Sequence, residues 1–182
     1  MMPRASLVPG LCVFAVLALA GTDAGAVPSS LRPGTKPHYF EFGPTVGYGF
    51  HGPLGPAGGA WLDYLYHFKG DAEGPALGVL TTFGAWKHRF AFNVGPMFQW
   101  DFKLVPSKAL GLYLGPHISA GYAFGAFDGR NYHSFYALVG PTLKLIVNDF
   151  WCFWARPLNF DIRYYGAITG NYGAAIGAGI TF

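Results

Sequence analysis

The side chains that could carry out chemistry are few, and the best-placed pair is His117 and Ser119. A histidine within reach of a serine hydroxyl can act as a general base in acyl transfer, and a carboxylate such as Glu41 or Asp161 could orient it. In an extended strand, residues two apart share a face. The alternation of apolar and polar residues assigns this face to the interior of a barrel, whereas a lipid substrate would approach from outside.

Other reactive arrangements are weaker still. His133 and Ser134 are adjacent, so a strand would point them to opposite faces. The six histidines are dispersed, with no Cys or His pair at ligand spacing, and no phosphate-binding or dinucleotide motif occurs. We therefore predict no metal site and no cofactor. Cys152 would be the lone cysteine after processing and is expected to act as a small hydrophobic residue.

The N-terminus has the layout of a secretory signal peptide. Arg4 is followed by an unbroken apolar run from Leu11 to Ala20, and then by the small residues Ala24-Gly25-Ala26. Such a run is too short to span a bilayer as a helix. We predict a signal peptide over residues 1–26, a linker over 27–37 and a domain over 38–182, the alternative being an N-terminal helix that is retained.

The composition is unusual for a soluble domain. The chain of 182 residues is 52% hydrophobic and 18% aromatic but only 12% charged, and 27 positions are Gly. Soluble domains carry about 25% charged residues and about 7% Gly. The net charge of +3 is scattered, which argues against nucleic-acid binding. Two stretches of nineteen uncharged residues, 109–127 and 164–182, are too rich in Gly to be membrane helices.

Apolar residues recur at every second position, which is the period of a β-strand. In the clearest segment, Phe98, Trp100 and Phe102 share one face, and Gln99 and Asp101 share the other. Gly, Pro and Asn-rich breakers separate the segments. Around residues 151–154 the alternation fails, and no boundary is assigned there. The pattern predicts eight strands over residues 40–51, 61–68, 77–84, 89–103, 110–122, 135–145, 158–164 and 172–182.

One face of every segment is bulky and apolar, whereas the other holds Gly and polar residues. If the bulky face pointed inward, the chain would be a soluble lipocalin-like barrel, but an eight-stranded barrel has little room for so many large side chains. We favour the bulky face outward, against lipid, with opposite charges paired in the lumen. The predicted interior charge network consists of Glu41, Asp63, Asp101 and Asp161 with Arg89, Lys103, Lys144 and Arg163.

Gly-Pro pairs recur inside four predicted strands. Strand prolines are normally confined to edges, first residues or bulges, and a closed barrel has no edge. We expect local bulges or bends, with each proline on the outer face. The alternative is that the pairs mark strand starts or kinks, and that the inner and outer faces are assigned wrongly there. The four pairs are Gly43-Pro44, Gly95-Pro96, Gly115-Pro116 and Gly140-Pro141.

The C-terminal segment carries a resemblance to a known group. Tyr172, Ile176, Ile180 and the terminal Phe182 alternate along it. With the export signal and the eight segments, the chain over 38–182 resembles a small bacterial outer-membrane β-barrel of the OmpA/OmpX type. The resemblance implies that these four residues form the signal read by the barrel-assembly machinery. It also implies an up-and-down antiparallel transmembrane barrel in the outer membrane, in contact with lipid and lipopolysaccharide. We expect the chain to depart from the best-known members in having short loops on both sides of the barrel and no peptidoglycan-binding domain.

The sequence thus predicts an integral outer-membrane barrel, without catalytic residues, that has a structural or interaction role and a lumen filled by side chains. Two alternatives remain open. One is a narrow pore for small solutes, which the Gly-rich inner faces could permit. The other is a hydrolase or transferase that modifies lipid A, as some eight-stranded barrels do.

Overall fold

The computed structural model describes residues 34–49, 57–86, 89–106, 110–127, 129–164 and 168–182. The predicted signal peptide and most of the predicted linker lie outside the described residues. Among the residues described, no helix is long and apolar enough to cross a bilayer.

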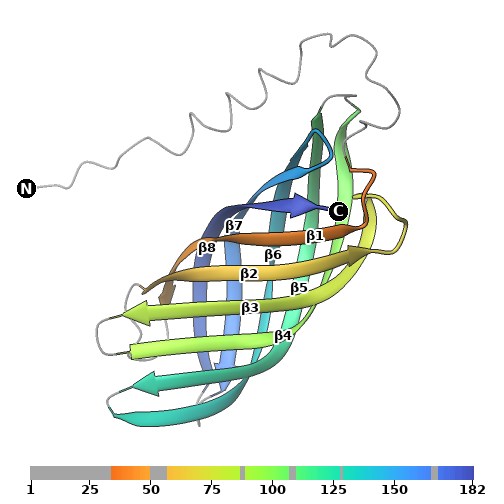
Figure 1. Ribbon diagram of the computed structural model, residues 1–182. Helices are drawn as coiled ribbons and strands as arrows, with labels where there is room; N and C mark the ends of the chain where they lie inside the picture. The colour runs from red at the N-terminus through yellow and green to blue at the C-terminus, as the bar shows by residue number, and fades with distance from the viewer. Residues whose placement is uncertain (1–33, 50–56, 87–88, 107–109, 128, 165–167) are drawn as a thin grey trace, which may run out of the picture.

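Eight antiparallel strands form a single closed barrel, in which each strand pairs with the next and β8 pairs with β1 (Figure 1). The predicted fold class is therefore confirmed. The C-terminus lies beside the start of β1, where His38 and Phe182 exchange two backbone hydrogen bonds of 3.2 and 3.0 Å. The strands are β1 (His38–Gly49), β2 (Ala57–His67), β3 (Gly74–Trp86), β4 (Arg89–Pro106), β5 (Leu110–Phe127), β6 (Arg130–Val147), β7 (Trp151–Tyr164) and β8 (Ile168–Thr181).

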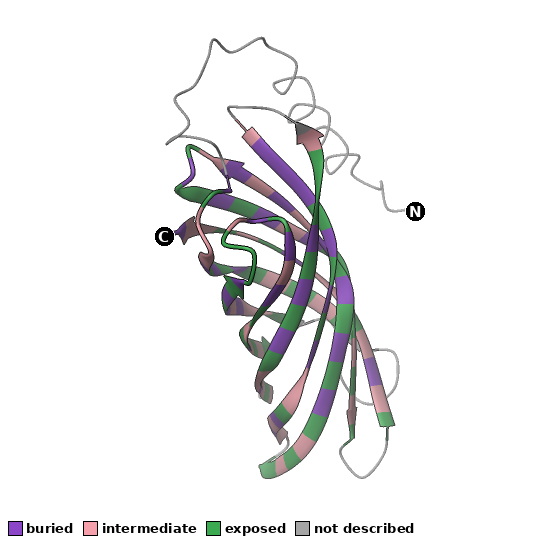
Figure 2. Ribbon diagram, turned by 90° about the vertical axis from the view of Figure 1, so that its right-hand side faces the viewer, coloured by how far each residue is buried: buried purple, intermediate pink, exposed green. Residues whose placement is uncertain are grey.

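The buried and exposed positions alternate along the strands, as the stripes in Figure 2 show. In β5, for example, His117 and Ser119 are buried in the lumen, whereas Leu114, Pro116 and Ile118 are exposed on the outer wall. The bulky apolar face therefore points outward, as the alternation predicts. In the soluble alternative these side chains would fill the lumen.

The largest difference from the predicted strands is in β7, which begins at Trp151 rather than at residue 158. The register of β7 with β8 shifts between Arg156 and Asn159, and both intervening residues, Pro157 and Leu158, are exposed. This bulge places two consecutive residues on the outer wall. It reverses the phase of the strand, which is why simple alternation fails before residue 158.

The expected bulge is found at none of the four Gly-Pro pairs, because the one register shift beside a pair comes from an extra residue in the neighbouring strand β7. At Gly140-Pro141 the register with β7 shifts between Val139 and Leu143. The other pairs keep a constant register with their neighbouring strands. All four prolines point outward, as expected.

The inner glycines have a specific steric cause. A Cβ on Gly78 would lie 1.7 Å from the carbonyl oxygen of Tyr64, and one on Gly43 would lie 2.0 Å from that of Ile176. The backbone of the adjacent strand crosses the position of the missing side chain. Glycine is required here because the strands coil tightly and approach each other on the inner side.

Candidate functional site

The lumen contains a cluster of charged side chains in the half of the barrel where β1 begins and β8 ends, and Arg156 of β7 is at its centre. One terminal nitrogen, Nη2, lies 2.9 Å from Glu41 Oε2 in β1, and Nη1 lies 2.7 Å from Asp63 Oδ2 in β2. The Nε atom donates a hydrogen bond of 3.1 Å to the hydroxyl of Thr142. With a further hydrogen bond of 3.4 Å to Gln99 of β4, one guanidinium connects β7 to four other strands.

Lys144 of β6 links the same cluster to β4. Its Nζ atom lies 3.1 Å from Glu41 Oε1 and 3.2 Å from Asp101 Oδ2. The cluster contains three carboxylates and two cations, so neutral donors supply the remaining hydrogen bonds. The amide of Gln99 donates to both oxygens of Asp101, at 2.9 and 2.8 Å, and the thiol of Cys152 donates to Glu41 at 3.5 Å.

Aromatic rings enclose the two cations. The guanidinium carbon of Arg156 lies 4.7 Å from the ring centroid of Trp61 and 4.5 Å from that of Trp154. Lys144 Nζ lies 4.7 Å from the ring centroid of Tyr39. The side chains of Glu41, Asp101, Lys144 and Arg156 are 0% exposed and that of Asp63 is 1% exposed. We call these five charged residues and the enclosing rings the plug.

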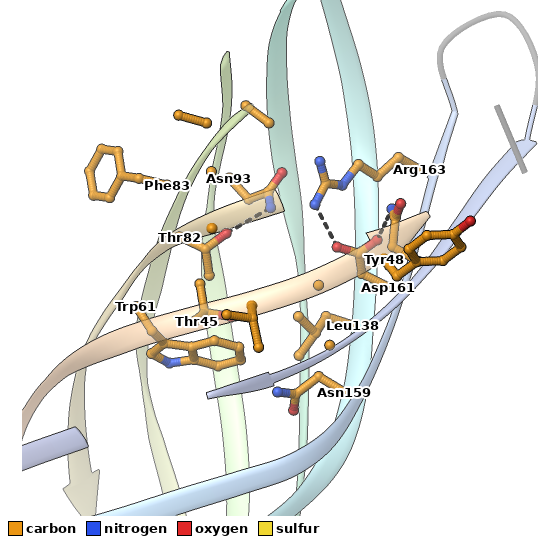
Figure 3. A pocket seen from close by; sticks show the side chains of 18 of the residues that line it. Thr45, Tyr48, Trp61, Thr82, Phe83, Asn93, Leu138, Asn159, Asp161 and Arg163 are labelled. Carbon is orange, nitrogen blue, oxygen red and sulfur yellow. Dashed lines mark hydrogen bonds and ion pairs between the residues drawn. The ribbon is translucent and has the colours of Figure 1, made fainter. Parts of the chain in front are cut away.

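Towards the other end of the barrel the lumen widens into a vestibule, with Trp61 of the plug in its lining (Figure 3). The vestibule contains about 840 Å³ of empty space, including its open mouth. In its wall, Arg163 Nη2 lies 2.5 Å from Asp161 Oδ2, and Asn171 donates to the same carboxylate. The Asn93 amide and the Thr82 hydroxyl share a hydrogen bond of 2.7 Å. The vestibule is polar along these side chains.

The structure divides the predicted interior charges into two groups. Glu41, Asp63, Asp101 and Lys144 meet in the plug, whereas Asp161, Arg163 and Arg89 line the vestibule. Lys103 joins neither group. It is exposed near the end of β4, with its Nζ atom 5.9 Å from the ring centroid of Tyr113, beside a register shift between Lys103 and Val105.

The sequence pattern missed Arg156, although it makes two of the ion pairs in the plug. Arg156 precedes the bulge at Pro157 and Leu158. Extending the alternation back from Asn159 across this bulge would place Arg156 on the outer face, although its side chain points inward. The Arg156-Pro157 pair was itself the available signal, because a proline in a central strand indicates a bulge and hence a change of phase.

His117 and Ser119, the candidate base and nucleophile, form hydrogen bonds with other residues. His117 Nδ1 shares a hydrogen bond of 2.9 Å with Thr142, and the ring packs edge-on against Trp61. Ser119 donates to the carbonyl of Pro96 at 2.8 Å and shares a 2.7 Å hydrogen bond with Tyr136. Both residues belong to the buried polar interior. His133 is on the outer surface, 2.5 Å from the Tyr122 hydroxyl. Within the described ranges, no group of three or more potential metal ligands comes together.

Residues 34–35, which precede β1, contact the turns at the end of the barrel where β1 begins and β8 ends. Asp149, in the β6–β7 turn with a φ of 53°, accepts hydrogen bonds from the backbone (2.8 Å) and the hydroxyl of Thr35. Its own carbonyl accepts a 2.7 Å hydrogen bond from Thr181. Gly34 accepts a bond from the backbone of Ala72 at 2.7 Å. Residues 34–35 thus connect two of the turns at this end.

Solved structures with similar backbones include small eight-stranded outer-membrane barrels. Neisserial surface protein A matches with a TM-score of 0.54 and 16% identity, over 80% of this chain and 97% of that one. The chain has the fold of a small outer-membrane β-barrel. Two further barrels match at lower TM-scores. Ail, the attachment invasion locus protein of Yersinia pestis, matches at 0.42, with 14% identity over 81% of this chain and 99% of its own. The N-terminal domain of Pseudomonas aeruginosa OprF matches at 0.47, with 14% identity over 81% and 98%.

No family model and no curated protein matches the sequence of this barrel. In β8, Tyr172 and Ile176 are exposed on the outer wall, and Phe182 follows the strand on the same side, 5.3 Å from His38 between ring centroids. Ile180 is half-buried. The residues of the predicted assembly signal therefore lie along the outside of the strand that closes the barrel.

Proposed function

We propose that this chain is an integral outer-membrane protein that does not conduct solutes and that serves a structural or interaction role. The observation that carries the proposal is the plug. Charged side chains from β1, β2, β4, β6 and β7 are fully buried against one another across the lumen. A solute would have to displace paired charges whose separation in a buried site is costly.

Membrane insertion is supported by the outer wall. Phe42, Val79, Ile118 and Ile162 are each about half exposed, and they belong to different strands around the barrel. A soluble protein rarely presents a continuous apolar surface of this kind, whereas a bilayer covers it favourably. Backbone pairing around a closed barrel also leaves no strand edge in the hydrocarbon.

The outer membrane is the compartment that fits the remaining features. The expected signal peptide would direct export, and the alternating outer residues of β8 end in Phe182. We infer that the barrel-assembly machinery folds the chain and that lipid and lipopolysaccharide surround it. The hydrogen-bond partners of His117 and Ser119 give no support to a lipid A-modifying activity.

Conductance across a planar bilayer tests the closed lumen. We expect the refolded wild-type barrel to insert without stepwise single-channel currents. A triple variant, Trp61→Ala with Trp154→Ala and Arg156→Ala, removes the stacked layer and should produce currents. Arg163→Ala is the matched control, since it removes an arginine from the vestibule but leaves the plug intact. Stepwise wild-type currents would overturn the proposal in favour of a narrow pore.

A further inference from the structure

The vestibule has room for a small molecule inside the barrel. Its empty space of about 840 Å³, counted with the open mouth, is within the usual range of small-molecule sites. Inner-face glycines line part of it, namely Gly47 of β1, Gly84 of β3 and Gly173 of β8. A Cβ on Gly84 would meet nothing within 4 Å, whereas one on Gly78, on the same face of β3, would lie 1.7 Å from a carbonyl oxygen. The space beside Gly84 is therefore open to a ligand.

A layer of hydrogen-bonded polar side chains also lines this space (Figure 3). The Asn93 amide of β4 shares the hydrogen bond of 2.7 Å with Thr82 of β3, and it lies 3.3 Å from Nη2 of Arg163 in β7. Arg163 pairs with Asp161, which accepts a hydrogen bond from Asn171 of β8. Together these amide, hydroxyl and carboxylate groups offer both donors and acceptors, which is what the hydroxyl groups of a ligand require.

The charge of the lining is net positive. Its charged residues are Arg89, Asp161 and Arg163, two cations and one carboxylate. Arg89 is the first residue of β4 and is half-buried, so it lies at the mouth of the vestibule. A cleft of one net sign concentrates ligands of the opposite sign, and the planar N–H fork of arginine matches a carboxylate. The lining therefore favours a ligand that carries a carboxylate.

The deep part of the vestibule is apolar, because Trp61 of the plug and Leu138 lie there. A ligand that suits the whole lining has a carboxylate, several hydroxyl groups and an apolar C–H face, and a sugar acid has all three on one ring. We propose that the vestibule binds a sugar acid such as a hexuronate, with its carboxylate on Arg89 and Arg163 and its hydroxyl groups on the polar layer. This proposal gives a ligand class to the interaction role proposed above and rests on it.

Saturation-transfer NMR on the refolded barrel in deuterated detergent tests the proposal, with D-glucuronate as the probe. We expect a dissociation constant of about 1 mM or below, the usual strength for a ligand of this size. D-Glucose, which has the same ring without the carboxylate, should bind about tenfold more weakly or worse. Equal binding of the two sugars would overturn the proposal. Full displacement of glucuronate by an equal concentration of acetate would do so too, because a bare carboxylate would then suffice.

Two pairs of variants locate the site. Arg89→Gln should weaken glucuronate binding about tenfold, the effect of losing hydrogen bonds to a charged group. Its control is Lys103→Gln, which removes a cation at the opposite end of β4 and should leave binding unchanged. Gly84→Phe fills the open space and should abolish binding, whereas Val79→Phe places its ring on the outer wall of the same strand and should not. Equal effects within either pair would overturn the proposal.

Heat-dependent gel mobility of the same samples reports folding. If Gly84→Phe does not fold, the comparison of Arg89→Gln with Lys103→Gln decides the outcome. A barrel that folds, inserts into vesicles and carries no current but binds no glucuronate refutes the vestibule site alone. Failure to insert, or stepwise currents, refutes the proposed function instead.

Discussion

Replacing Arg156 with methionine removes the central cation of the plug while keeping a long apolar side chain. The change breaks the ion pairs at 2.9 Å to Glu41 and at 2.7 Å to Asp63. Lys144 still neutralises Glu41, but Asp63 loses its arginine partner and retains the indole N–H of Trp61, at 2.9 Å.

The expected loss in the free energy of unfolding is about 3–5 kcal/mol, the usual cost of removing one partner of a buried ion pair. The stacking of the guanidinium on Trp61 and Trp154 places the expectation in the upper half of that range. Since domains of this size are stable by about 5–15 kcal/mol, the variant should still fold. Arg163→Met is the control. Its pair with Asp161 is partly open to the vestibule, with side chains 12% and 13% exposed, so we expect a smaller loss of about 1–2 kcal/mol.

Urea unfolding of the refolded barrels in detergent micelles, followed by tryptophan fluorescence, measures both variants. Adding Asp63→Asn to Arg156→Met should recover about 1–3 kcal/mol, because the unpaired buried carboxylate is then gone. A loss below about 1 kcal/mol for Arg156→Met, or equal losses for both arginine variants, would refute the role given to Arg156.

Three further outcomes are expected. Gly78→Ala should lower the free energy of unfolding by about 1–3 kcal/mol in the same urea assay, because the new Cβ would lie 1.7 Å from a neighbouring carbonyl oxygen. Gly84→Ala in the same strand is the control. Its Cβ would meet nothing within 4 Å, so stability should change by less than about 0.5 kcal/mol. Deleting Phe182 should lower the amount of heat-modifiable barrel in outer membranes several-fold without preventing refolding in detergent; unchanged assembly in cells would argue against an assembly signal there. The mass profile of lipid A should be the same in cells expressing the wild type and His117→Ala, and loss of acyl chains that depends on His117 would instead establish an enzyme.

Alternation in the sequence was enough to predict eight strands and their outward face, because lipid and lumen impose opposite requirements on successive residues. The alternation predicted β4 and β5 best, because few positions there break the two-residue period. The prediction failed at the start of β7, because a bulge shifts the inner and outer positions by one residue, and the place of a bulge depends on tertiary contacts. There, Arg156 turns inward to reach Glu41 and Asp63 on distant strands.

The composition of the interior was predictable, but its pairing was not. Eight charges on one face indicated a network, yet which of them meet depends on strand register and depth along the barrel. Lys103 illustrates the point: it has the inner phase but lies too close to the end of β4 to be enclosed. Conversely, Gly on the inner face suggested limited space, and the actual constraint is the carbonyl group of the adjacent strand, as at Gly78.

Cell fractionation combined with heat-dependent gel mobility tests most directly whether the apolar wall of the barrel faces lipid. We predict that the chain, expressed in a Gram-negative host, is recovered in the outer-membrane fraction and changes its mobility on boiling. Recovery in the soluble periplasmic fraction, with no change of mobility, would contradict it.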